Sequence, residues 1–384
     1  PAGWSAVISD WAVPVLLGGA AIWGLTGCGT EARTFVVDTS ADLVDVTPGN
    51  GICATAAGTC SLRAAVMEAN AWAQPDGETI VLEASVTYPL TLTGTAEDGA
   101  ANGDLDLVGP LHVQGAGATI DATAAGERVI QVVTGDVDLS DVTLTGGVAD
   151  VGAGLLASPG TSTTLIGVTV ADGTASVRGG GIAALQSGGV GADLSLEAST
   201  ITANTATAGG GGVFVDANGS LTVDESTFAA NVACPTSCVG QAWGGGVFSE
   251  SPVTVTASTF DGNDTPNGSG SAIYVAQTSL DVRNSTITGG TTFDGSVRTW
   301  DGVVSNLEHV TISGNDGAIA VFHAGPGAVA TITGSIIGDQ LSGTDCGGGY
   351  PPLGGGCNTP AGATRRLAPP TAPPDRDPPP LPAA

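Results

Sequence analysis

The chain has 384 residues, of which 42% are hydrophobic, 12% are charged and 61 are glycine. Glycine is costly inside helices, so this content excludes a mainly helical protein, and the glycines cluster without the three-residue period of collagen. Nine basic residues against 37 acidic ones give a formal net charge of -28. Such a surface repels nucleic-acid phosphates, anionic lipid headgroups and polyuronates, so we expect no nucleic-acid partner.

The N-terminal segment, residues 1–34, has the features of an export signal. Its apolar run from Val13 to Thr26 has the length of a signal-peptide apolar region. The run leads into Leu25-Thr26-Gly27-Cys28, which resembles the lipobox of bacterial lipoproteins. That resemblance implies lipidation of Cys28 and contact with a membrane through this anchor alone. The alternative is a buried hydrophobic strand or cap.

Residues 35–78 contain the one convincing helix of the sequence, from Ser61 to Trp72. Ser61 can cap it, and an apolar face is formed by Leu62, Ala65, Val66 and Ala69. The stretch from Phe35 to Ala71, with Cys60-Ser61-Leu62-Arg63-Ala64-Ala65 at its centre, resembles the CSLREA domain, an N-terminal module of bacterial β-helix surface proteins. The resemblance implies a cap that covers the open strand edge of a solenoid.

The seven cysteines are consistent with export. Setting Cys28 aside leaves three close pairs, Cys53 with Cys60, Cys234 with Cys238, and Cys346 with Cys357. Each pair lies in a segment rich in Gly, Thr or Pro, so we predict local disulfides in an oxidising compartment. A zinc site is the weaker competitor, because the spacings are irregular and no histidine lies near a pair. We expect no metal and no cofactor.

A short motif recurs from residue 142 onward, with a small residue, Thr, an apolar residue, two variable positions and Asn or Gly. Its apolar position recurs roughly every 25 to 32 residues, within the range of solenoids, at Leu144, Val170, Ile201, Phe228, Phe260, Ile287, Ile312 and Ile337. An alternating strand precedes the motif, and a glycine cluster with an apolar strand completes each repeat. Three short strands split by turns describe one coil of a β-helix.

We therefore predict an all-β fold, a single right-handed parallel β-helix over residues 79–358 with a short N-terminal capping helix. Neighbouring coils lie about 4.8 Å apart, so equivalent apolar side chains stack into interior columns. One turn position recurs as Asn204, Asn231, Asn263 and Asn315. These are predicted to form an asparagine ladder that hydrogen-bonds adjacent coils. Residues 359–384, rich in Pro and Ala, are predicted to be a disordered tail.

Two further resemblances concern location and function. The repeats are similar to those of chlamydial polymorphic membrane proteins, which are adhesins, because Phe228-Ala229-Ala230-Asn231 and Phe260-Asp261-Gly262-Asn263 match their FxxN motif. The region from Ser335 to Cys357 resembles the end of a choice-of-anchor β-helix domain. Together they imply a cell-surface or outer-membrane lipoprotein, or an extracellular protein.

Many β-helix proteins cleave polysaccharides, so catalysis is the main alternative. A lyase needs a base such as Arg, and the repeats contain Arg178, Arg283 and Arg298, of which Arg283 is expected to pair with Asp281 at the surface. A hydrolase needs two carboxylates about 5 to 9.5 Å apart, whereas acidic residues at turns are ordinary.

We predict no catalytic residues. The expected function is a monomeric, non-catalytic cell-surface or secreted scaffold or adhesin that binds glycan or a surface protein. The alternative is a polysaccharide lyase or glycoside hydrolase on the same fold. A groove with converging carboxylates or an arginine would favour the enzyme, and a smooth face of Ser, Thr and Ala would favour the scaffold.

Overall fold

The computed structural model describes residues 32–72, 77–94, 98–235, 242–300, 302–323, 329–338, 341–348 and 364–367. The predicted lipidation site Cys28 lies outside these residues, as do Cys238 and Cys357. None of the described helical segments has the length and apolar character that a membrane span requires.

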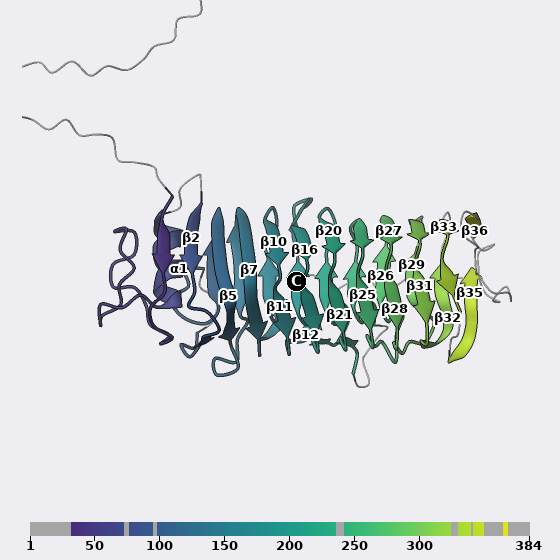
Figure 1. Ribbon diagram of the computed structural model, residues 1–384, viewed down its shortest axis with the longest axis horizontal. Coiled ribbons are helices and arrows are strands. Elements are labelled where there is room, and N and C mark those ends of the chain that lie inside the picture. Colours follow the sequence, from purple (N-terminus) through teal and green to yellow (C-terminus); the bar gives the residue numbers. More distant parts are fainter. Residues whose placement is uncertain are drawn as a thin grey trace, which may run out of the picture. The chain divides into compact units, whose positions relative to one another are not determined.

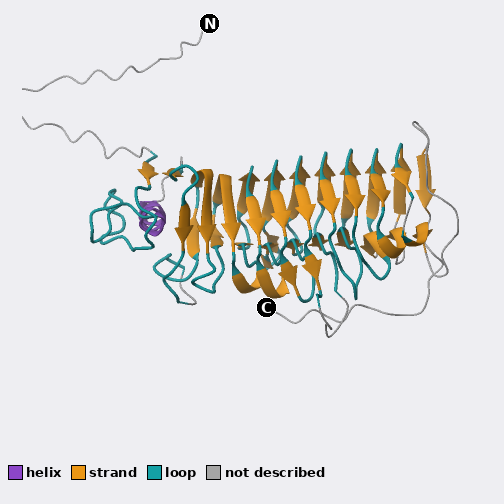
Figure 2. Cartoon of the chain, turned by 60° about the horizontal axis from the view of Figure 1, so that its bottom comes forward, coloured by secondary structure: helices purple, strands orange, loops and turns teal. Residues whose placement is uncertain are grey.

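The described chain is an all-β right-handed parallel solenoid with one helix near its N-terminal end, as the sequence predicts. Figure 1 shows the coils following one another in chain order along the long axis, and Figure 2 shows the strands stacked in separate walls. Parallel pairing between successive coils supplies the hydrogen bonds of each wall.

The first sheet is built from two rows of strands that meet at a corner. Its first row comprises β1 (Thr34–Val36), β2 (Glu78–Val81), the start of β5 (Leu111–Asp121), the start of β7 (Asp136–Thr145), β10 (Ser162–Ile166), β16 (Asp193–Glu197), β20 (Ser220–Asp224), β24 (Val253–Thr256), β27 (Ser279–Arg283), β30 (Val304–Glu308) and β33 (Val329–Thr333). Its second row comprises β3 (Thr87–Pro89), the ends of β5 and β7, β11 (Thr169–Ala171), β17 (Thr200–Thr202), β21 (Thr227–Ala229), β25 (Thr259–Asp261), β28 (Thr286–Thr288), β31 (Thr311–Ser313) and β34 (Ile336–Ile337).

Two further parallel sheets complete the coils. The second sheet comprises β8 (Val148–Val151), β12 (Thr174–Arg178), β18 (Thr205–Ala206) and β22 (Val232–Ala233). The third comprises β4 (Leu105–Val108), β6 (Ile130–Thr134), β9 (Leu155–Ala157), β13 (Ile182–Ala184), β19 (Val213–Val215), β23 (Val247–Ser249), β26 (Ile273–Ala276), β29 (Gly295–Trp300), β32 (Asp316–His323) and β35 (Ser342–Gly348). A small hairpin of β14 (Gln186–Ser187) and β15 (Val190–Gly191) projects from one coil.

The predicted interior column is present. Strand pairing places its members directly opposite one another, and each is at most 1% exposed: Leu144, Val170, Ile201, Phe228, Phe260, Ile287, Ile312 and Ile337. The rings of Phe228 and Phe260 stack with centroids 4.7 Å apart, close to the strand spacing. Each such side chain contributes about 2 kcal/mol by leaving water.

The corner after this column carries buried asparagines. Asn204 Nδ2 donates to Asn231 Oδ1 at 3.0 Å, and Asn231 Nδ2 donates to Asn263 Oδ1 at 2.9 Å. Each amide also donates to a backbone carbonyl one coil earlier. Gly290 occupies the equivalent place in the following coil, so Asn315 bonds backbone instead, accepting from Gly290 N at 3.0 Å.

The corner within the first sheet carries a second ladder, of serines. Ser199, Ser226 and Ser258 are buried, and each hydroxyl accepts from the backbone N–H of the preceding coil at 3.0 to 3.1 Å. The residue before each serine has positive φ, including Ala198 at 47° and Ala257 at 50°. This conformation costs about 1 kcal/mol for a residue other than glycine, and it turns the hydroxyl of the following serine inward.

The N-terminal end is closed by α1 (Leu62–Trp72), which contacts β1, β2 and β4. Ser61 Oγ accepts from Ala64 N at 3.1 Å, which is the expected cap, and the predicted apolar face is buried. Arg63 is fully buried, with its Nε 2.5 Å from the Asp42 carboxylate and its other nitrogens donating to backbone carbonyls. Arg63 therefore helps to join the cap to the first coils, as does Asn70, which hydrogen-bonds the backbone of Asp106 and Val108 in β4.

The predicted disulfide between Cys53 and Cys60 is confirmed. Cys234 is also disulfide-bonded. The backbone of Cys346 lies in β35, and nothing further is described for its predicted pair. Within the predicted tail, β36 (Thr364–Leu367) pairs antiparallel with β33, so these four residues form a strand where we expected disorder. A strand there covers backbone groups that an open edge would expose.

Candidate functional site

The second row of the first sheet presents a continuous column of threonines on its outer side. Strand pairing places each opposite the next: Thr87, Thr119, Thr143, Thr169, Thr200, Thr227, Thr259, Thr286 and Thr311. All are half-buried or exposed. A second outer column lies two residues further along each strand and consists mostly of small side chains. From Thr145 to Ala229 this second column contains no charged residue. We call these two columns the threonine face.

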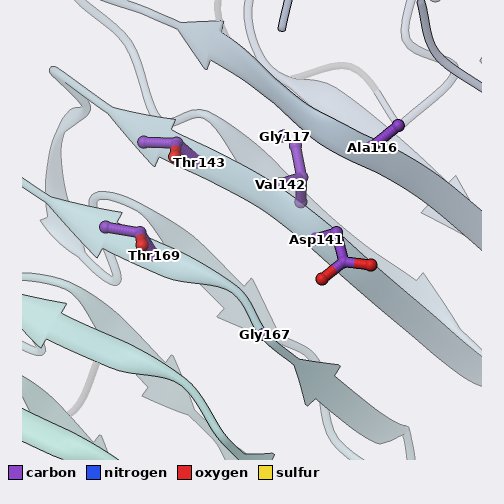
Figure 3. A pocket seen from close by; sticks show the side chains of 7 residues that line it. All are labelled: Ala116, Gly117, Asp141, Val142, Thr143, Gly167 and Thr169. Atoms are coloured by element: carbon purple, nitrogen blue, oxygen red, sulfur yellow. The ribbon is translucent and has the colours of Figure 1, made fainter. Parts of the chain in front are cut away.

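A shallow depression of about 360 Å³ lies at the corner beside this face (Figure 3). Thr143 and Thr169 line one side, and Asp141 lines it at the corner itself. Asp141 is the sole ionisable residue among those lining the depression. The paired carboxylates of a hydrolase and the arginine base of a lyase are therefore both missing among the residues described at this spot.

The third sheet carries an aromatic cluster on its outer side. Phe214, Phe248 and Tyr274 are neighbours in register and only 1%, 3% and 4% exposed. The Trp243 ring lies 5.6 Å from Phe248 and 6.2 Å from Tyr274, and Gly209 leaves room for this packing, since a Cβ there would lie 2.9 Å from the Phe248 ring. These rings form a closed floor, because too little of them is exposed to stack on a ligand.

A row of half-buried side chains runs beside this floor, at the ends of the strands of the third sheet or one position after them. It comprises Leu185, Asp216, Glu250, Ala276 and Trp300, and we call it the axial row. Backbone hydrogen bonds from Asp216 N to Ala184 O and from Glu250 N to Val215 O continue the strand register, and Ala276 pairs with Trp300. Two carboxylates therefore lie on adjacent coils, with apolar side chains before and after them.

Arg178, at the end of β12, lies next to this pair of carboxylates. Its guanidinium is 4.9 Å from the Phe214 ring, it makes no ion pair among the described residues, and its buried Nε has no hydrogen-bond partner. Burial raises the pKa of Glu250, as does the Asp216 charge, while Arg178 opposes the rise. Burial lowers the pKa of Arg178, against the attraction of Glu250 and then Asp216.

Tyr274 and Arg298 have structural roles beside the row. Arg298 forms an ion pair with Asp294, and its guanidinium carbon lies 5.2 Å from the Trp300 ring. It also hydrogen-bonds the buried Tyr274 hydroxyl, whose pKa is raised to about 12 by burial. Asp294 in turn accepts from Ser269 Oγ at 2.8 Å. These contacts fix the end of the aromatic floor.

The remaining charged residues singled out in the sequence lie apart. Arg283 bonds Asp281 at 2.7 Å and reaches Glu308 at 3.5 Å, so it is the expected surface ion pair. His112 pairs with Asp138 at 3.0 Å on the first row. The described part of the chain contains no group of three or more His, Cys, Asp or Glu residues placed to hold a metal ion.

The aromatic floor and the axial row were missed by sequence analysis. Their strands read Val213-Phe214-Val215, Val247-Phe248-Ser249 and Ile273-Tyr274-Val275. A strand that faces water on one side alternates apolar and polar residues, and the apolar residue at the middle position of each of these strands breaks that alternation. Such a pattern indicates that both faces of the strand are buried.

The family model of the right-handed beta helix region matches residues 129–331. Among solved structures, the chain is similar to the pectate lyase Pel9A, with 13% identity and a TM-score of 0.37, covering 77% of this chain and 78% of that one. This likeness carries no inference about activity. No curated protein matches the sequence.

Proposed function

Because the chain belongs to the right-handed β-helix family, we propose that it is a non-catalytic cell-surface or secreted scaffold or adhesin whose threonine face binds glycan or protein. The observation that carries the proposal is the unbroken register of nine threonines on successive strands. Each hydroxyl can both donate and accept, at a repeat of about 4.8 Å. Threonine is β-branched and stiff, so little side-chain entropy is lost on binding.

Export is part of the same proposal. A signal or lipoprotein-like segment over residues 1–34, with Cys28 as its lipid site, would place the solenoid outside the cell. The disulfide between Cys53 and Cys60 fits an oxidising compartment. The net charge of -28 favours solubility of a monomer and disfavours nucleic-acid and polyuronate ligands. Labelling of intact cells with an impermeant reagent tests the location.

The binding test is a glycan array probed with the full chain, followed by titration of any ligand found. In the Thr200→Arg/Thr227→Arg variant, two bulky charges replace neighbouring hydroxyls, and we expect binding to weaken at least tenfold. The matched control is Ser195→Arg/Thr222→Arg, which alters the outer side of the same coils on the first row. Equal binding by both variants would remove the threonine face from the proposal.

A second candidate function is polysaccharide cleavage at the axial row. It is favoured by one observation, the proximity of Arg178, at the end of β12 in the second sheet, to Asp216 and Glu250 on the third. A glycoside hydrolase would use Glu250, whose pKa is raised, as the general acid and Asp216 as its carboxylate partner. Release of reducing ends from a polysaccharide panel, abolished in Glu250→Gln, would establish this function and displace the scaffold.

A further inference from the structure

We propose that the N-terminal cap, residues 32–72, is a docking surface for a second copy of this chain, so that two solenoids join end to end through their caps. Strand β1 of each copy pairs antiparallel with β1 of the other across a two-fold axis. This surface is separate from both the threonine face and the axial row. Three features of the cap point to it: an open strand edge, exposed apolar side chains, and a stretch of surface without exposed charge.

One edge of β1 is open. The strand pairs in parallel with β2, and Val37 N donates to Val81 O at 3.0 Å, so Val37 and the alternate residues before it bond β2. Successive residues of a strand direct their backbone groups to opposite sides. The N–H and C=O groups of Thr34 and Val36 therefore point away from β2, and within the described residues no strand pairs with β1 on that side.

A depression of about 370 Å³ lies beside this edge. It is lined by residues 33–36 together with Gly51, Cys53 and Cys60. The cap loop reaches the edge at Asp38, whose N–H donates to Cys60 O at 2.9 Å. A further strand would lie about 4.8 Å from β1, in the space that the depression leaves open. An unpaired edge of this kind is a template for pairing with another chain.

The open edge is complementary to a second copy of itself. When two β1 strands lie antiparallel with Phe35 opposite Phe35, Thr34 of each copy faces Val36 of the other. Each of these pairs exchanges both of its N–H···O=C hydrogen bonds, because all of these groups lie on the open side. Contact of one surface with itself across a two-fold axis is complete with two copies, so it yields a dimer and not a filament.

Exposed apolar side chains accompany the open edge. Among the described residues, twelve large hydrophobic side chains are exposed, and five of them lie within residues 36–52. Val36, Val46 and Ile52, which we call the cap patch, are 62%, 57% and 63% exposed. Ile52 follows a residue that lines the depression together with Val36, and Val46 N donates to Ala54 O at 3.0 Å, so the three lie on neighbouring segments. A second copy that covers the cap patch removes this apolar surface from water.

The charge distribution favours the cap over the coils as the place of self-contact. The chain has a formal net charge of -28, so most of its surface repels a second copy. Residues 39–59 contain two acidic residues and no basic one. The Asp42 side chain is 1% exposed and forms an ion pair with Arg63, and Asp45 is 5% exposed and accepts from two backbone N–H groups. The outer surface of this stretch therefore presents no charge to a second copy.

Contact through the caps also keeps the acidic coils of the two copies apart. The cap lies at one end of the stack of coils, so the coils of two joined copies extend in opposite directions (Figure 1). Charges two or more coils from the cap are about 10 Å away from the contact, beyond the Debye length of about 8 Å in physiological salt. The charged residues that flank the uncharged stretch, Arg33 and Asp38, have opposite signs.

Sedimentation equilibrium of the full chain, from about 1 µM to about 1 mM, measures the association. We expect a monomer at the low end and a dimer at the high end, with association strengthened by NaCl because salt screens the like charges. Val46→Asp places a carboxylate in the cap patch of each copy and should weaken association at least tenfold. Val304→Asp is the matched control, because Val304 is 59% exposed on the outer side of β30, and it should associate as the wild type does.

Two further readouts tie the association to β1. Val36→Pro removes an N–H that points away from β2, and an edge strand tolerates proline there, so this variant should associate at least tenfold more weakly than the wild type. In hydrogen exchange, the amides of residues 34–37 should become more protected as the concentration of the wild type rises. Far-UV circular dichroism with urea unfolding confirms that each variant folds.

Several results would overturn the proposal. These are a monomer at every concentration, association of Val46→Asp or Val36→Pro equal to that of the wild type, equal weakening by Val304→Asp, and exchange at β1 that does not change with concentration. Association that weakens as NaCl is raised would also overturn it. Association that survives Val46→Asp would assign the self-contact to another part of the chain.

Discussion

The asparagine ladder supplies the sharpest stability prediction, at Asn231. Its Nδ2 donates to Ile201 O at 2.8 Å and to Asn263 Oδ1 at 2.9 Å, and its Oδ1 accepts from Asn204 N at 3.1 Å and Asn204 Nδ2 at 3.0 Å. Asn231→Ala removes all four bonds in a site with no exposure. At about 1 kcal/mol each, and more for the groups left unsatisfied, the loss is about 4 to 6 kcal/mol.

Equilibrium urea unfolding followed by far-UV circular dichroism measures this loss. The matched control is Asn306→Ala, on the outer side of β30, where the side chain reaches Asp281 at 3.5 Å. That change should cost less than about 0.5 kcal/mol. Because each coil contacts only its neighbours, the Asn231 variant should also open first around its own coil in hydrogen exchange. A shift in Asn231→Ala no larger than in Asn306→Ala would refute the reasoning.

Three further predictions concern the cap and the axial row. Arg63→Met leaves the Asp42 carboxylate buried without its ion pair, so urea unfolding should show a loss of about 3 to 5 kcal/mol, and a loss below 1 kcal/mol would contradict that role. Replacing Cys53 and Cys60 with serine frees a short loop, and unfolding should show a loss of about 2 kcal/mol; an unchanged midpoint under non-reducing conditions would count against it. The pKa of Glu250 is raised in the folded chain, so the folded chain binds this proton more tightly than the unfolded chain does. The resulting stabilisation of the folded chain is complete below the ordinary pKa of 4.5 and is lost as pH rises through the folded pKa. Glu250→Gln should therefore be more stable than wild type at pH 7, with the gap closing below pH 4.5, and an equal gap in the exposed control Glu197→Gln would contradict this.

The interior of the solenoid could be predicted from sequence because its positions repeat. Phe228 and Phe260 share one motif, and a column follows directly from the repeat length. The serine ladder could not be predicted in the same way. Ser199 and Ser226 turn inward because Ala198 and Glu225 adopt positive φ, and neither residue type favours that conformation. Coil-to-coil pairing imposes it.

The axial row could not be predicted from the sequence, for a different reason. Arg178, Asp216 and Glu250 come from three coils and three unlike local sequences, with insertions of different length between them. No motif links them, and their proximity depends on the register that the strands adopt. The strand edge covered by β36 is a similar case, since a Pro-rich tail gives no signal for four paired residues.

The most direct test of the scaffold proposal is a crystal structure of the full chain with the ligand that the glycan array identifies. If the threonine face binds this ligand, electron density for an uncleaved ligand should lie across the outer side of β7, β11, β17, β21, β25 and β28. The ligand should hydrogen-bond successive threonine hydroxyls. Density confined to another wall, or a cleaved product beside Asp216 and Glu250, would contradict it.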